Sequence, residues 1–96
     1  MFITITSSSV PSQHVAAVEA FLAEFLPRMK KFPGVRAIYH YTGPEKGDEA
    51  TVVVWDDEQA VHSYRQSDLI QEALAYERSL GIPSTREGYP LTIALA

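Results

Sequence analysis

Residues 35–55 read VRAIYHYTGPEKGDEATVVVW and contain two strand patterns separated by a turn. Within residues 35–41 one set of side chains alternates with another, Val35, Ala37, Tyr39 and Tyr41 against Arg36, Ile38 and His40. Such alternation is typical of a strand with two different faces. Residues 50–55 carry bulky or β-branched side chains on both faces, which predicts a strand covered on both sides. The Gly, Pro and charged residues at 43–48 favour a turn, so the stretch predicts an antiparallel hairpin.

Strands are also predicted near both ends of the chain. Residues 2–6 and residues 89–95 alternate in the same way, and both segments contain β-branched side chains. Pro90 near the start of the last segment indicates an edge strand or an opening position. The serines at 7–9 are expected to connect the first strand to a helix.

A long amphipathic helix is predicted between the first strand and the hairpin. Apolar residues recur every three or four positions from Pro11 onward, and Ser9 or Ser12 can cap the first turn. Pro27 removes one backbone hydrogen bond and crowds a carbonyl, so we expect a kink or a break near Leu26.

Two further helices are predicted after the hairpin. Asp56 is a suitable N-cap for a short helix that ends at Arg65. Ser67 is a suitable cap for the next helix, and Gly81 is typical of its C-terminal end.

The resulting order of elements predicts an α+β fold over one domain, residues 1–96, with the ferredoxin-like split βαβ topology and a four-stranded antiparallel sheet. Right-handed crossovers place the helices on one face of that sheet. The other face keeps large apolar side chains such as Tyr39, Val53 or Leu91, more than a monomer usually exposes. Burying about 600 Å² there is worth on the order of 15 kcal/mol before association costs. We therefore expect a homodimer with its sheets packed face to face.

Composition excludes several classes of function. Eight Lys and Arg against twelve Asp and Glu give a net charge of −4, so we expect no nucleic-acid or membrane partner. The absence of Cys excludes disulfides and thiolate metal sites, and the three His are far apart in the sequence, so no metal site is expected. The first residues lack the basic region of a leader, and no apolar run approaches a membrane span, which predicts a cytoplasmic protein.

Several motifs together resemble the antibiotic-biosynthesis monooxygenase (ABM) family of the dimeric α/β-barrel superfamily. They are the Pro-Gly turn before a strand at 33–36, the strand ending in Trp and followed by acidic residues and Ala at 50–60, and the Ser-Asp at 67–68. The resemblance implies a dimeric α/β barrel. It also implies one of the family's chemistries, which include cofactor-free oxygenation of phenols and quinols as well as haem degradation.

Individual positions favour some of these chemistries over others. The haem-degrading branch has a Trp, a second aromatic residue and a haem-ligating His at three spaced positions. The corresponding positions of this chain hold Trp55, Tyr64 and Leu74. Leucine cannot ligate iron, and the chain has no Asn, which that branch and some of the oxygenases use. Haem degradation is therefore disfavoured, and we expect no bound cofactor. Quinol-oxidising relatives commonly have His at the place of Tyr64; a phenol there can donate a hydrogen bond but is a poor base.

Three residues are predicted to be catalytic: His40, Trp55 and Tyr64. His40 is either a rim histidine or a general base for a phenolic proton, because imidazole exchanges protons near neutral pH. Trp55 is either a core anchor or a flat wall for an aromatic ring. Further binding residues are predicted at Tyr39, Tyr41, Thr51, Arg36 and His62.

The sequence thus predicts a cofactor-independent monooxygenase acting on a small phenolic or quinol-type aromatic. The alternative is a non-catalytic, dimeric ligand-binding or stress-associated α/β-barrel protein, which the missing Asn favours. Arg36, together with Arg65, is either an anchor for an anionic group of the ligand or part of a surface ion pair.

Overall fold

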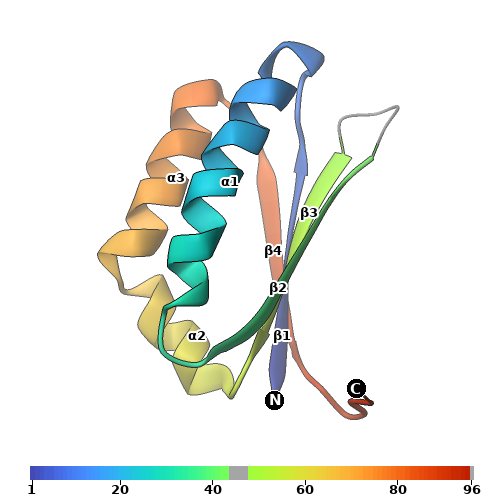
Figure 1. Cartoon of the computed structure of the whole chain (residues 1–96), viewed down its shortest axis with the longest axis vertical. Coiled ribbons are helices and arrows are strands. Elements are labelled where there is room, and N and C mark those ends of the chain that lie inside the picture. Colours follow the sequence, from blue (N-terminus) through green and yellow to red (C-terminus); the bar gives the residue numbers. More distant parts are fainter. Residues whose placement is uncertain (44–47, 96) are drawn as a thin grey trace.

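The computed structural model describes residues 1–43 and 48–95, and its helices all lie on one face of a four-stranded sheet (Figure 1). The elements in chain order are β1 (Phe2–Ser9), the 3₁₀ turn η1 (Ser12–His14), α1 (Val15–Lys30), β2 (Val35–Thr42), β3 (Asp48–Trp55), α2 (Glu58–Arg65), α3 (Asp68–Leu80) and β4 (Ser84–Pro90). The sheet order is β2-β3-β1-β4 and all neighbours are antiparallel. The ferredoxin-like prediction is confirmed. The sheet of one chain stays open, with β2 and β4 at its edges.

Strand β1 is longer than its local pattern predicts. Ser7, Ser8 and Ser9, expected as a connection, continue the strand and pair with β3, while Ser7 and Ser8 also pair with β4. A strand between two neighbours has ladder partners for its backbone groups on both sides, which holds even a serine-rich segment in extended form.

The last strand lies earlier in the chain than predicted. β4 is Ser84–Pro90 rather than residues 89–95, so Pro90 ends the strand. Because Phe2 begins β1 and pairs with Pro90, the residues after Pro90 run past the end of their partner strand. Ile93 and Leu95 consequently remain exposed.

The hairpin of β2 and β3 is confirmed, although residues 44–47 of its predicted turn lie outside the described residues. Its register shifts between Val35 and Ala37, so Val35 opposes Trp55 and belongs to the core, whereas Tyr39 faces away from the helices. Simple alternation would put Val35 and Tyr39 on the same face of β2. The bulge between them reverses the side-chain direction at the start of the strand, so that Val35 faces the helices.

Gly34, next to this bulge, is a position that only glycine suits. Its φ is +92°, and a Cβ there would overlap the Cβ of Ala60 in α2. Its carbonyl accepts a hydrogen bond from the backbone N–H of Asp56. The missing side chain therefore lets α2 pack directly against the start of β2.

The helix ends agree with the sequence in part. Ser67 accepts from the N–H of Ile70 and Gly81 adopts the left-handed conformation at φ +65°, both as predicted. The cap of α2 is Asp57 rather than Asp56, because Asp56 pairs with Arg36 instead. A local sequence signal predicts that a carboxylate caps the helix. Which of two neighbouring carboxylates does so depends on the tertiary contacts that each one makes.

Helix α1 departs from expectation at both ends. It begins at Val15 after the 3₁₀ turn, and neither Ser9 nor Ser12 caps it with a side chain. The predicted break near Leu26 is wrong, since α1 continues through Pro27 to Lys30. Pro27 is exposed, so solvent can serve the carbonyl that loses its partner.

The core lies between the helices and the sheet. Its most buried side chain is Trp55, 1% exposed, surrounded by apolar residues of all three helices and of the sheet, among them Phe25, Met29, Val53, Val61, Tyr64 and Ile70. The opposite sheet face leaves Tyr39 65%, Tyr41 60% and Tyr89 50% exposed. Within the described residues, no helix is both long and apolar enough to cross a bilayer.

Candidate functional site

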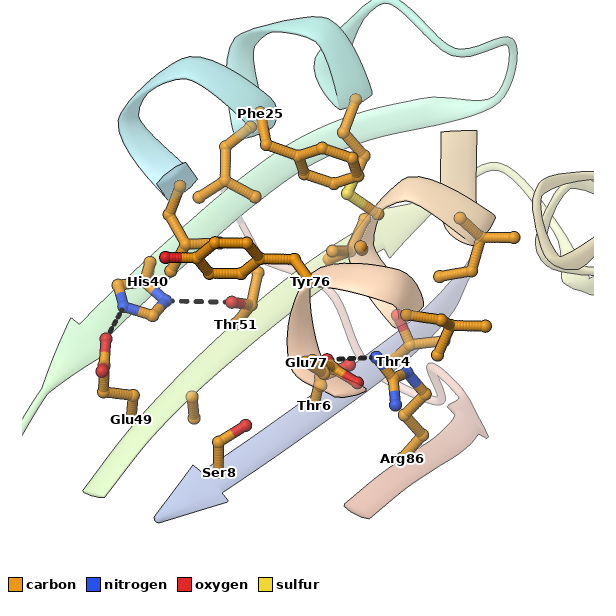
Figure 2. Close-up of a pocket in the computed structure, with 18 of the residues that line it drawn as sticks. Thr4, Thr6, Ser8, Phe25, His40, Glu49, Thr51, Tyr76, Glu77 and Arg86 are labelled. Carbon is orange, nitrogen blue, oxygen red and sulfur yellow. Dashed lines mark hydrogen bonds and ion pairs between the residues drawn. The ribbon is translucent and has the colours of Figure 1, made fainter. Parts of the chain in front are cut away.

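A cavity of about 340 Å³ separates the helices from the inner face of the sheet (Figure 2). Helices α1 and α3 line it with aliphatic and aromatic side chains, including Phe21 and Tyr76, whose rings stack with centroids 4.1 Å apart. The sheet contributes most of the polar groups, from Thr4, Thr6, Ser8, His40, Glu49 and Thr51. A mostly apolar cavity with a few convergent polar groups is typical of a site for a small organic molecule.

The clearest polar cluster in this cavity is the chain Thr51–His40–Glu49. Thr51 Oγ1 lies 2.9 Å from His40 Nδ1, and Glu49 Oε1 lies 2.9 Å from His40 Nε2 (Figure 2). The side chain of Glu49 is 3% exposed and that of His40 is 19% exposed. The imidazole therefore bridges a hydroxyl and a buried carboxylate.

Strand register builds this cluster. His40 is directly opposite Thr51, and Thr42 is directly opposite Glu49, which puts all four on the helix-facing side of two neighbouring strands. The Thr42 hydroxyl lies 3.4 Å from Glu49 Oε1 and 3.3 Å from Glu19 Oε1. Among the described residues, the second oxygen of Glu49 has no hydrogen-bond partner.

Sequence reasoning missed Glu49. The predicted turn ended at residue 48 and the predicted strand began at residue 50, which left Glu49 outside the strand, whereas β3 begins at Asp48. A usable signal existed, since Glu49 has the same parity as Thr51, Val53 and Trp55. Extending the strand by two residues places its carboxylate on the same face as the tryptophan.

Trp55 and Tyr64 close the cavity at the end where β3 meets α2. The indole Nε1–H donates to Thr4 Oγ1 at 2.9 Å, which holds the indole plane against β1. The Trp55 and Tyr64 ring centroids are 5.3 Å apart. Burial raises the pKa of Tyr64 to about 12. At neutral pH this phenol stays protonated and can act only as a neutral hydrogen-bonding group.

An ion pair lies on the other side of the cavity from His40 (Figure 2). Arg86 Nη2 is 2.6 Å from Glu77 Oε1, with side chains 30% and 24% exposed. The sequence did not point to Arg86, because the last strand was predicted to start three residues after it. Because the two charges neutralise each other, the pair adds polar groups but no net charge to that side of the cavity.

These features coincide with a match to a known family. The family model for antibiotic biosynthesis monooxygenase matches residues 1–76, about four fifths of the chain and everything from β1 into α3. The chain belongs to the antibiotic biosynthesis monooxygenase (ABM) family.

Solved structures agree with this ABM fold. A candidate antibiotic biosynthesis monooxygenase from Deinococcus radiodurans superposes with a TM-score of 0.91 at 16% identity, covering 100% of this chain and 97% of its own. SnoaB from Streptomyces nogalater, a cofactor-independent oxygenase, gives 0.84 at 16% identity, covering 98% and 95%. A protein of unknown function from Nitrosomonas europaea gives 0.83 at 20% identity, covering 99% and 92%. A search of curated proteins finds no match.

The cavity of this ABM protein brings together four of the predicted site residues. His40, Thr51, Trp55 and Tyr64 all line it. Leu74, at the place of the haem-ligating His, lines it as well. In the part of the chain that the structure describes, no group of three or more His, Asp or Glu could hold a metal ion.

The other predicted binding residues are not among the cavity lining. Tyr39 and Tyr41 face away from the helices, because they alternate with His40 on β2. Arg36 pairs with Asp56 at 2.6 Å on the exposed surface. His62 is exposed on α2. Arg65, considered beside Arg36, is exposed but does contribute to the cavity lining.

Proposed function

We propose that this ABM protein is a cofactor-independent monooxygenase that acts on a small phenolic or quinol-type aromatic. The observation that carries the proposal is that His40 and Trp55 line one largely apolar cavity. The imidazole supplies the proton acceptor that a phenol needs, and the aromatic side chains supply surfaces for its ring. SnoaB, a cofactor-independent oxygenase with the same fold, is a precedent for this chemistry.

The reaction needs no reductant other than the substrate. Loss of the phenolic proton to the protein gives a phenolate, which is electron-rich enough to pass an electron to oxygen. One oxygen atom then enters the ring and the other leaves as water, so a phenol and O₂ give a quinone and H₂O. The cavity would keep bulk water away from the reactive anion.

Oxygen uptake tests this proposal. We expect uptake with at least one member of a panel of quinols and hydroxynaphthoquinones, and a large loss of kcat in His40→Ala and Trp55→Phe. His14→Ala, on the 3₁₀ turn and outside the cavity lining, is the matched histidine control and should retain wild-type uptake. Failure of the whole panel, or equal activity in His40→Ala, would contradict the assignment.

The second candidate is a non-catalytic dimeric ligand-binding or stress-associated protein. Two observations favour it: the chain has no Asn, and both ring nitrogens of His40 already have protein partners. This candidate predicts that members of the same panel raise the melting temperature without any oxygen uptake.

We propose in addition that the protein works as a homodimer built on the outer sheet face. Three tyrosines project from that face with half or more of their surface exposed, Tyr39, Tyr41 and Tyr89. They lie beside the aliphatic side chains of Ile3, Ile5, Val52 and Val54. A contiguous apolar surface of this kind favours association. Sedimentation at micromolar concentration should give a dimer; a stable 10.7 kDa particle would rule this out.

A further inference from the structure

The hydrogen bonds of His40 raise a question about the proposed proton transfer. Nε2 faces Glu49 and Nδ1 faces Thr51, each at 2.9 Å. Neither ring nitrogen of His40 is thus free to meet a substrate directly. Either the Thr51 contact breaks when substrate binds, or the proton passes through it.

The carboxylate decides the direction of the hydrogen bonds. An ionised Glu49 can only accept, so the Nε2–H of His40 donates to Glu49 Oε1. In the neutral imidazole Nδ1 then carries the lone pair, and the Thr51 hydroxyl donates to it. With its proton directed at His40, the Thr51 oxygen keeps its lone pairs for a donor in the cavity that it lines.

We propose that Thr51, His40 and Glu49 form a proton relay in which the Thr51 hydroxyl, rather than the imidazole, contacts the phenol of the substrate. The inference rests on the proposed function, whose first step it specifies. The substrate O–H bond breaks and its proton goes to Thr51 Oγ1, while the Thr51 proton goes to His40 Nδ1. The products are a phenolate, an unchanged threonine and an imidazolium, with no change in oxidation state.

Glu49 acts as the positioning residue of this relay. Its carboxylate holds the imidazole in the required tautomer and stabilises the imidazolium that forms, as in a hydroxyl–histidine–carboxylate triad. Deep burial strengthens this effect because little solvent screens the charge. The Thr42 hydroxyl also faces this carboxylate, 3.4 Å from Glu49 Oε1 and 3.3 Å from Oε1 of Glu19, an exposed residue of α1.

The same three groups resemble those of a hydrolase, with Thr51 as nucleophile. That chemistry needs backbone or side-chain donors directed at a developing oxyanion. Thr51 lies on β3, a central strand whose backbone pairs with β2 on one side and β1 on the other. Within the described sheet the backbone N–H groups beside Thr51 are thus engaged in ladders, and the geometry favours proton transfer over nucleophilic attack.

The relay can be tested without oxygenation, with 4-nitro-1-naphthol as the probe. Its anion is coloured, and the nitro group blocks the para position, at which a 1,4-quinone would form. Burial in an apolar cavity alone raises the pKa of a bound phenol. With the relay intact we expect the bound probe to ionise at lower pH than the free probe, with about tenfold more anion at a fixed pH below the midpoint.

Four variants separate the parts of the relay. Thr51→Val keeps the shape of the side chain but removes the hydroxyl, and should reverse the shift, so that the bound probe ionises at higher pH than the free probe. His40→Gln and Glu49→Gln should do the same, while Thr51→Ser should retain the wild-type shift. Circular dichroism and probe affinity show that each variant is folded and still binds.

Three outcomes would overturn the relay. They are a wild-type shift in Thr51→Val, an unshifted probe in the wild-type protein, and acetylation of Thr51 by 4-nitrophenyl acetate, which would make it a nucleophile. The proposed function can fail independently of the relay. If the probe shift depends on Thr51 but no quinol supports oxygen uptake, the relay is correct and the oxygenase assignment is wrong. If oxygen uptake occurs and Thr51→Val leaves it unchanged, the oxygenase assignment is correct and the relay is wrong.

Discussion

The two faces of the sheet are built from the same strands but present opposite surfaces. The inner face carries the Thr51–His40–Glu49 cluster and Trp55 beneath the helices, enclosed in a cavity. The outer face carries Tyr39, Tyr41 and Tyr89, with at least half of each side chain exposed. Alternation along a strand separates the two sets by a single residue. The sheet thus separates a polar cavity from an exposed tyrosine-rich surface by its own thickness.

The largest expected effect concerns the inner face. Trp55→Ala should lower the free energy of unfolding by about 3–5 kcal/mol, because it empties the centre of the core and leaves Thr4 without its donor. Urea denaturation measures this. Tyr39→Ala is the outer-face counterpart, and its effect should depend on protein concentration because it acts through association. A loss below about 1 kcal/mol for Trp55→Ala would mean that the inner face is not the core.

A charge on the outer face should separate the subunits. Val52→Glu places like charges near the centre of the proposed interface and should raise the dimer dissociation constant by about 100-fold or more. Sedimentation velocity over a dilution series measures it. Gln71→Glu, exposed on α3, adds the same charge on the helical side and should leave association unchanged. If both variants changed the dissociation constant equally, the outer sheet face would not be the dimer interface.

Alkaline pH should weaken the packing of the inner face through Tyr64. Burial raises the pKa of Tyr64 to about 12, from the ordinary value of 10.0. Above pH 10 the unfolded chain therefore releases a proton that the folded chain retains. Stability is complete below pH 10 and falls by about 2–3 kcal/mol as the pH rises to 12. Chemical denaturation at pH 9 and pH 12 should show this loss in the wild-type protein, and a smaller loss in Tyr64→Phe.

The smallest expected effect is on stability at Glu49. Glu49→Gln should change the free energy of unfolding by about 1 kcal/mol or less, or increase it, because it removes a buried charge while its amide oxygen still accepts from His40. Thermal denaturation measures it. A loss above about 3 kcal/mol would mean that the carboxylate serves the fold rather than the relay.

Sequence patterns located much of the fold but only part of the site. The hairpin, the Ser67 cap and the Gly81 end followed from local chemistry, and all are present. His40, Thr51, Trp55 and Tyr64 were named from residue type and resemblance, and all reach the cavity. Glu49 and Arg86 were missed because both lie where a strand begins earlier than its apolar pattern. Strand limits depend on partners, which local patterns do not contain.

Local periodicity and capping chemistry alone determined the number and order of the strands and α-helices, because those signals act over a few neighbouring residues. Tertiary structure decided the rest: the bulge that turns Val35 into the core, the register that joins His40 to Thr51 and brings Glu49 within reach, and the face on which each tyrosine lies. These are contacts between segments far apart in the chain. A shift of one residue in strand pairing moves every side chain of the strand to the opposite face of the sheet. Only the assembled sheet therefore fixes which residues face the cavity.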